Sequence, residues 1–245
     1  MKKLYDFCRG EFAAWHLFEV LWMFFATISI TVIAVILGDT ALGISSALAG
    51  TMYTMLAGKG KLSCYFFGIY NTIAYGLIAK GQTLFGDMML NWFVYLPMMI
   101  AGIVMWRRKL DSGSCVIKAS LSGKERVFWI FALLLALAVY SFILAKLGDK
   151  QPVIDGATTV LSVAAMILTL KRCIEQWLLW TTVNALSIVM WARVYFSGGG
   201  SVATLLWWMI MLISGIIFFI QWYRDLKLTS SSSAGSSAEK CSGAF

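Results

Sequence analysis

The sequence predicts an all-α polytopic membrane protein with eight predicted transmembrane helices. Of its 245 residues, 60% are hydrophobic and only 13% are charged, whereas soluble domains are about half apolar and a quarter charged. Apolar runs follow one another along the chain, and several reach the ~20 residues that cross a ~30 Å hydrocarbon core. The eight runs span approximately 12–37, 41–57, 64–79, 84–106, 126–147, 155–170, 175–196 and 202–222.

The basic residues support this number of spans and orient the chain. The net charge of +8 comes from short loops between the apolar runs, which is typical of membrane topology rather than of nucleic-acid binding. If the N-terminus is cytoplasmic, all but four of the 20 basic residues fall on the cytoplasmic side, the exceptions being Lys80, Lys146, Lys150 and Arg193. The positive-inside rule therefore predicts that both termini are cytoplasmic.

The motifs of enzymes and metalloproteins are missing from the sequence. It has a single His, and no HExxH motif, nucleophile elbow or Gly-rich phosphate loop. The five cysteines form no CxxC pair and fall at or near the predicted cytoplasmic face, which argues against disulfides and a zinc site. The last run, 202–222, has no lysine for a retinal Schiff base. We therefore expect no catalytic residues, no metal and no cofactor.

Two groups of three helices resemble each other across one linking helix. CYFFGIYNTIAYG (64–76) aligns without gaps onto WLLWTTVNALSIV (177–189), an offset of 113 residues. The third helices end alike, in MWRRKL (105–110) and QWYRDLK (221–227). A single linking helix returns the chain to the same side, so we predict parallel repeats about an axis along the membrane normal. In such transporters the substrate site lies near the midplane between the repeats.

These repeats define the predicted domain organisation, a 3+1+3 core with an extra N-terminal helix outside the repeats. The tail after the last span is rich in Ser, Gly and Ala, a composition too poor in apolar residues to pack. The predicted segments are 1–40 (N-terminal tail and extra transmembrane helix), 41–109 (first three-helix repeat), 110–150 (cytoplasmic loop and linking helix), 151–225 (second three-helix repeat) and 226–245 (disordered cytoplasmic tail).

Two stripes of polar and aromatic residues are the candidates for a binding site. Side chains three and four residues apart share one face of a helix. The stripe in the second repeat consists of Trp177, Trp180, Asn184, Ser187 and Trp191, and its counterpart in the first consists of Cys64, Phe67, Asn71, Tyr75 and Ile78. The alignment pairs Phe67 with Trp180 and Asn71 with Asn184 at equal depth.

Two interpretations of the paired asparagines remain. An amide in hydrocarbon without a partner costs several kcal/mol, so both must face protein or a wet cavity. Each could bond a neighbouring helix, which is a common stabilising contact in membrane proteins. Alternatively, Asn71 and Asn184 face one central pocket with aromatic walls. Rings would then stack a flat heterocycle while the amides bind ribose or carboxamide groups.

Other polar residues have weaker claims to a binding role. Gln82, Asp87 and Asn91 precede or open the third run and are further candidates. Trp207 and Trp208 fit the interfacial aromatic belt, and Asp155 fits a solvated or helix-capping position. His16 and Glu19, three residues apart in the extra helix, are expected to be structural. Since no carboxylate lies at mid-depth of the core, we favour uniport over a proton relay.

The stretches KLSCYFFGIYN (61–71) and VLSVAAMIL…QWLLWTTVN (160–184) resemble the PnuC family of bacterial nicotinamide riboside transporters. Asp155 and Trp106 fit the same resemblance, which covers roughly residues 43–225. It implies a SWEET-like fold in the bacterial inner membrane and uptake of nicotinamide riboside for NAD synthesis by facilitated diffusion. A cytoplasmic nicotinamide riboside kinase would trap the product by phosphorylation.

Site roles follow from this resemblance residue by residue. Trp180 would stack the nicotinamide, and Asn71 and Asn184 would contact ribose or carboxamide. The family has Gln where this chain has Asn91, which keeps an amide but changes its reach. The resemblance leaves open a related vitamin such as thiamin or riboflavin, or a sugar, as the substrate, and a non-transporting receptor or scaffold is a further alternative. A homo-oligomer is left open as well.

Overall fold

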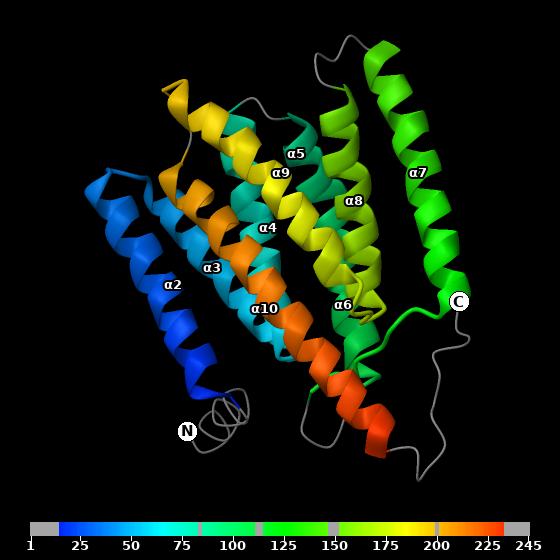
Figure 1. Cartoon of the computed structure of the whole chain (residues 1–245). Helices are drawn as coiled ribbons and strands as arrows, with labels where there is room; N and C mark the ends of the chain where they lie inside the picture. The colour runs from blue at the N-terminus through cyan, green and yellow to red at the C-terminus, as the bar shows by residue number, and fades with distance from the viewer. Residues whose placement is uncertain (1–14, 83–84, 111–114, 147–151, 199–200, 233–245) are drawn as a thin grey trace.

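Helices make up almost all of the computed structural model, which describes residues 15–82, 85–110, 115–146, 152–198 and 201–232 (Figure 1). Within these ranges extended structure is confined to three isolated β-bridges. In chain order the elements are α2 (Leu17–Ile36), α3 (Ala41–Gly58), α4 (Cys64–Gly81), α5 (Phe85–Met89), the π-helix η1 (Leu90–Tyr95), α6 (Leu96–Arg107), α7 (Gly123–Lys146), α8 (Pro152–Leu170), α9 (Gln176–Phe196) and α10 (Val202–Ser232).

Five described segments are long and apolar enough to cross a membrane by length and composition: Leu17–Ile36, Gly86–Arg107, Gly123–Lys146, Pro152–Leu170 and Val202–Lys227. The protein is therefore all-helical and membrane-like, as the sequence predicts. Helices α3, α4 and α9 fall outside this group because Ser, Thr, Asn and Gln side chains lower their hydropathy. The predicted number of eight spans therefore stays a prediction for these three helices.

The third apolar segment is not one regular helix. A π-helical stretch, Leu90–Tyr95, separates α5 from α6. Pro97 in the first turn of α6 has no N–H to donate to the carbonyl four residues earlier, which explains why the regular ladder is interrupted here. Single π-helical turns are frequent at functional sites, and this one carries Asn91 and Tyr95.

Helices α2 and α7 occupy opposite edges of the bundle (Figure 1). Among the described helices α7 packs only against α8, and none of its residues is buried. Helix α2 packs against α3 and α10. Its Glu19 forms an ion pair with Lys59 at 2.9 Å, and Trp22 Nε1 donates to Ser214 Oγ of α10 at 3.0 Å. Glu19 also accepts a hydrogen bond from the backbone N–H of His16 at 2.7 Å. Its carboxylate is therefore bound by Lys59 and by the His16 backbone.

The turn after α3 and the turn after α8 have the same hydrogen-bond pattern. Gly60 and Arg172 both take positive φ, 70° and 60°. In each turn the next residue then donates to a carbonyl five positions back, Lys61 N to Leu56 O in the first and Cys173 N to Leu168 O in the second, both at 2.9 Å. The two segments therefore adopt one conformation although their sequences, KGKLS and KRCIE, differ.

Two buried tryptophans connect α6 and α10 to the ends of α8 and α3. Trp106 Nε1 of α6 donates to Thr169 O near the end of α8 at 3.0 Å. Trp222 Nε1 of α10 donates to Gly58 O at the end of α3 at 2.7 Å. Both indoles are fully buried. Helix α6 is thus connected to α8, and α10 to α3.

A segment before α7, residues 115–122, crosses both turns, and we call it the strap. Val116 N donates to Gly60 O at 2.8 Å, and Ala119 N donates to Arg172 O at 3.0 Å. Further along, Leu121 N donates to the Glu175 carboxylate at 3.2 Å. The strap therefore binds equivalent carbonyls of the two matched turns.

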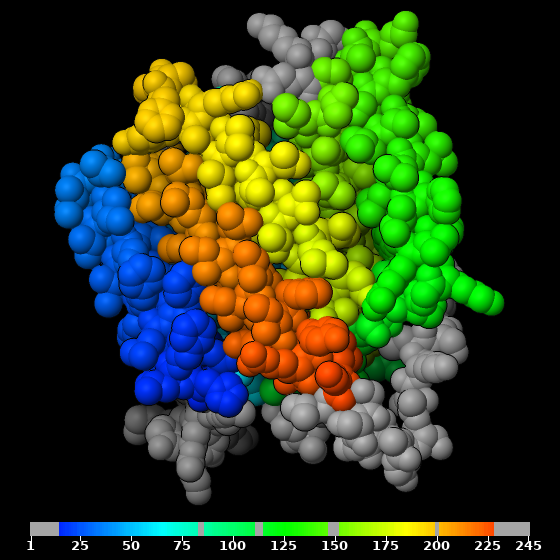
Figure 2. All heavy atoms as spheres, viewed as in Figure 1, coloured from blue at the N-terminus to red at the C-terminus, as the bar shows by residue number. Residues whose placement is uncertain are grey.

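Figure 2 shows α10 lying diagonally across the face of the bundle beside α9, with α2 at its other flank. Helix α10 continues to Ser232, beyond the predicted boundary at residue 225. The remainder of the predicted tail, and residues 1–14 of the predicted N-terminal segment, lie outside the described residues.

Candidate functional site

Six helical segments surround one internal cavity. The cavity has a volume of about 90 Å³, several times the ~10–15 Å³ that one water needs. The lining residues come from α3 (Tyr53, Thr54, Ala57), α4 (Asn71, Thr72, Tyr75), η1 and α6 (Asn91, Tyr95, Met99), α8 (Met166, Thr169), α9 (Gln176, Trp177, Trp180, Asn184) and α10 (Trp207, Trp208, Met211, Gly215).

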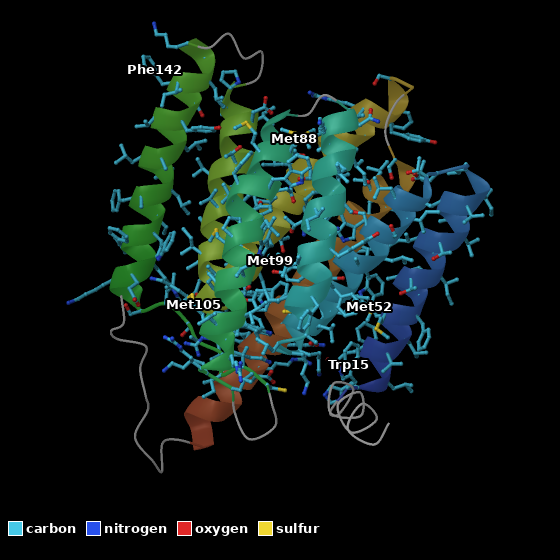
Figure 3. All side chains as sticks on the ribbon, turned by 180° about the vertical axis from the view of Figure 1, so that it is seen from behind. Trp15, Met52, Met88, Met99, Met105 and Phe142 are labelled. Atoms are coloured by element: carbon cyan, nitrogen blue, oxygen red, sulfur yellow. The ribbon has the colours of Figure 1, made fainter. Side chains whose placement is uncertain are left out.

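Neither edge helix contributes to this lining, so the cavity belongs to the helices between them. Met99 shows its position most plainly, at about half the height of the bundle between α6 and α4 (Figure 3). A cavity at this height is enclosed by helix middles rather than by loops.

Aromatic rings form most of the cavity wall. Trp180 of α9 contacts Tyr95 edge-on, with ring centroids 6.0 Å apart. The ring centroids of Trp207 and Trp208 of α10 lie 4.7 Å apart, and each lies within 6.0 Å of the ring centroid of Tyr75. Such pairs hold rings in fixed orientations while their remaining faces are free to stack a planar ligand.

Three asparagines line the cavity with different hydrogen bonding. Asn71 Nδ2 donates to Ser46 O of α3 at 2.8 Å, so this amide also connects two helices. Asn91 Nδ2 donates to Asp87 O of the preceding turn at 2.8 Å. Asn184 is only 5% exposed, and among the described residues it has no hydrogen-bond partner. Of the three asparagine amides, that of Asn184 keeps its full hydrogen-bonding capacity for a ligand.

Buried donors in the same wall also lack partners. Gln176 Nε2 and the indole N–H groups of Trp177 and Trp207 find no acceptor within the described part of the chain. Leaving a buried donor unpaired costs about 1–3 kcal/mol. A ligand rich in acceptor oxygens would offset that cost, with small side-chain rotations bringing the donors to it.

The lining contains Asn, Gln, Thr, Tyr, Trp, Met, Ala and Gly, and no Lys, Arg, His, Asp or Glu. Nothing in it would neutralise a phosphate group, and aromatic faces are its main electrostatic feature toward a cation. Within the described residues no group of three or more His, Cys, Asp or Glu side chains could hold a metal. The cavity therefore suits an uncharged or cationic planar molecule with hydroxyl and amide groups.

The structure brings together six of the ten residues proposed from sequence: Asn71, Tyr75, Asn91, Trp177, Trp180 and Asn184. The other four do not line the cavity. Phe67 is 37% exposed on the outside of α4, and Gln82 follows the end of that helix. Ser187 and Trp191 are buried further along α9, where Trp191 Nε1 donates to Tyr75 Oη at 2.7 Å.

Several lining residues were not predicted. Trp207 and Trp208 fit a membrane-interface belt in the sequence, but both are buried in the cavity wall. Helices α3 and α8 contribute Tyr53, Thr54 and Thr169, and their polar residues show no distinctive pattern in the sequence. Gln176 opens α9 and lay within the QWLLWTTVN stretch, so its polarity inside an apolar run was an available signal.

A membrane-like bundle of helices around a cavity of aromatic and amide side chains is typical of a membrane transport protein. The chain belongs to the family described as nicotinamide mononucleotide transporter, whose model matches residues 40–224. This finding confirms the resemblance carried by KLSCYFFGIYN and QWLLWTTVN. The members named here are transporters and not enzymes, as expected from the sequence.

Relatives and a solved structure agree with this assignment. The nicotinamide riboside transporter PnuC of Neisseria mucosa is 32% identical, with 89% of this chain and 86% of the relative covered. The protein of the same name from Haemophilus influenzae is 34% identical, over 76% of this chain and 84% of its own. A crystal structure of the vitamin B3 transporter PnuC matches with a TM-score of 0.82 and 31% identity, covering 90% of this chain and 97% of that one.

Proposed function

We propose that this protein transports nicotinamide riboside across the bacterial inner membrane through the central cavity. The observation that carries the proposal is the combination of Trp180, an aromatic wall and the unpartnered amide of Asn184 in one uncharged cavity. Trp180 would stack the nicotinamide ring, and Asn71 and Asn184 would contact the ribose or the carboxamide. Named relatives that share at least 30% of their residues support the same substrate.

The riboside fits the cavity better than the mononucleotide. A phosphate monoester carries close to two negative charges at neutral pH and is bound in proteins by Arg, Lys or clusters of N–H donors. None of the described lining residues is cationic. Burying the phosphate here would leave its charge uncompensated, so the phosphate-free nucleoside is the proposed substrate.

The 3+1+3 arrangement of two parallel repeats, 41–109 and 151–225, is part of this proposal. The matched turns at Gly60 and Arg172 and the reciprocal bonds of Trp106 and Trp222 support it. With eight crossings, the positive-inside rule places both termini in the cytoplasm. The binding site then lies near the midplane, between the two groups of helices.

Transport is proposed to run as facilitated diffusion. The described lining residues include no carboxylate and no histidine to carry a coupled proton. A gradient of the substrate suffices if a cytoplasmic kinase converts the riboside to its phosphate, which the uncharged cavity would not return. The kinase is a functional partner, and this coupling needs no physical contact with it.

Uptake into proteoliposomes tests the proposal. Protein in vesicles preloaded with unlabelled nicotinamide riboside should exchange it for labelled riboside, and the mononucleotide should not compete. Trp180→Ala should lose this exchange, whereas Trp129→Ala, on edge helix α7, should retain it. Exchange of thiamin or riboflavin but not of nicotinamide riboside would overturn the substrate. Binding of the riboside without any exchange would instead indicate a receptor.

A further inference from the structure

A hydrogen bond connects the carboxylate of Asp87 to the cavity wall. Tyr75 lines the cavity, and its hydroxyl donates a hydrogen bond to Asp87 Oδ2 at 2.8 Å. Trp191 Nε1 donates to the same hydroxyl oxygen at 2.7 Å. Tyr75 is thus held on both sides, with its ring in the cavity wall and its hydroxyl on the carboxylate. Both Tyr75 and Trp191 are buried.

The carboxylate of Asp87 has no cationic partner among the described residues. The ion pairs in these ranges are Glu19–Lys59, Lys118–Asp225 and Arg126–Glu175, all on other elements. A partly buried carboxylate with one hydroxyl donor keeps most of its attraction for a positive charge, because low-dielectric surroundings screen it poorly. The position is therefore electrostatically incomplete without a cation.

The proposed substrate supplies a positive charge. The glycosidic bond of nicotinamide riboside joins ribose to the ring nitrogen, which makes the ring a pyridinium ion with a permanent charge of one. Moving such an ion into the bilayer core is costly unless the protein offers compensation. Trp and Tyr faces provide part of it through cation–π contacts. The lining residues themselves provide no anion.

We propose that Asp87 is a specificity-determining residue that supplies the countercharge for a pyridinium ring in the cavity. It acts from behind Tyr75, to whose hydroxyl it is hydrogen-bonded, and is not itself a lining residue. Trp191 is a positioning residue that keeps the Tyr75 hydroxyl on the carboxylate. The proposal rests on the proposed function, since it explains how the same cavity distinguishes a cationic nucleoside from a neutral one of the same shape.

Paired ligands of equal shape test this inference. Nicotinamide riboside and benzamide riboside, its carbon-linked and uncharged isostere, are titrated against the purified full-length chain by calorimetry. The wild type is expected to prefer the cation. In Asp87→Asn the amide oxygen still accepts from Tyr75 Oη, so only the charge is removed. Affinity for nicotinamide riboside should fall about tenfold while that for benzamide riboside stays within about twofold.

Two further variants make the result specific. Asp87→Glu keeps the charge and should keep the preference for the cation. Asp225→Asn removes a carboxylate at the other end of the bundle, where it pairs with Lys118, and should leave the ratio of the two affinities unchanged. If Asp87→Asn proves unstable in a thermal melt, Asp87→Ser replaces it as a second neutral variant that retains an acceptor.

The outcomes separate the two proposals. An unchanged affinity ratio in the neutral Asp87 variants, or an equal loss of both ligands, would overturn the role of Asp87 and leave the proposed function intact. A wild type that binds neither riboside would overturn the proposed function, and the role of Asp87 would fall with it.

Discussion

Trp180 Nε1 donates a hydrogen bond to Thr169 Oγ1 at 3.1 Å, which fixes the indole of α9 against the end of α8. The Thr169 hydroxyl donates a hydrogen bond to Ala165 O at 2.9 Å, and the Thr169 carbonyl accepts one from Trp106 Nε1. One threonine therefore holds two tryptophans, of which one lines the cavity and the other connects α6. If Trp180 is the stacking ring, as proposed, its orientation is set before any ligand arrives, which lowers the entropy cost of binding.

Thr169→Val tests this orientation. Valine has the shape of threonine but no acceptor, so the Trp180 N–H would lose its partner at a cost of about 1–3 kcal/mol. We expect nicotinamide riboside to bind roughly tenfold more weakly, as measured by calorimetry. Thr158→Val on the same helix is the control, because the Thr158 hydroxyl only bonds backbone carbonyls of its own helix. Equal affinities in both variants would show that the bond does not orient the ring.

Substitutions of Asn71 and Asn184 should differ in how much they reduce stability and how much they reduce binding. Asn71→Leu removes the bonds to Ser46 that connect α4 to α3, so the melting temperature should fall together with affinity. Asn184→Leu breaks no bond within the described residues and should reduce affinity at least tenfold with little change in melting temperature. Thermal unfolding with and without nicotinamide riboside measures both quantities. A stability loss for Asn184→Leu as large as that for Asn71→Leu would contradict this assignment.

At Gly50 the backbone of α3 packs directly against the ring of Trp207 in the cavity wall. A Cβ added there would lie 2.5 Å from Cε2 of Trp207, so Gly50→Ala should displace that ring and cost about 1–3 kcal/mol. We expect a lower melting temperature and weaker riboside binding. Trp207→Phe in the same chain removes the clashing atoms and should restore part of the stability. Gly123→Ala, with nothing within 4 Å, is the matched control.

The ion pair between Glu19 and Lys59 anchors the edge helix α2. Glu19 is 3% exposed and Lys59 16%, so removing one partner leaves a largely buried charge. Glu19→Gln should therefore destabilise the protein by on the order of 3 kcal/mol in thermal unfolding. The double variant Glu19→Gln with Lys59→Gln should lose less than the two single changes added together. Strict additivity would show that the pair does not couple.

Much of the architecture could be read from the sequence because long apolar runs and loop charges report directly on a membrane environment. The break at Leu90–Tyr95 could not, since hydropathy does not distinguish a π-helix from an α-helix. Pro97 was the local signal for it. Hydropathy is also a weak guide to α3, α4 and α9. The polar residues with which these helices line the cavity lower their hydropathy, so they do not stand out as membrane spans.

The cavity was predictable from its most unusual residues only. Asn71, Asn184 and Trp180 stood out because lipid gives no reason for them, whereas Tyr53 and Met211 are ordinary within apolar helices. The repeat alignment was also one residue out of step with the turns. Counted from Cys64 and Gln176, where α4 and α9 begin, Asn71 is eighth and Asn184 is ninth. The two asparagines are therefore not at equivalent positions of their helices, and only Asn71 is hydrogen-bonded to a neighbouring helix.

The strap limits how the two halves of the bundle can move. Val116 and Ala119 hold the carbonyls of Gly60 and Arg172, so only three residues of chain tie one turn to the other. A fully extended chain of three residues reaches at most ~10 Å. While both bonds persist, the two turns must stay within that reach of each other, whereas no such short connection limits the opposite end, where Asp87 lies, among the described residues. A wide opening between the two turns requires one of these two bonds to break first.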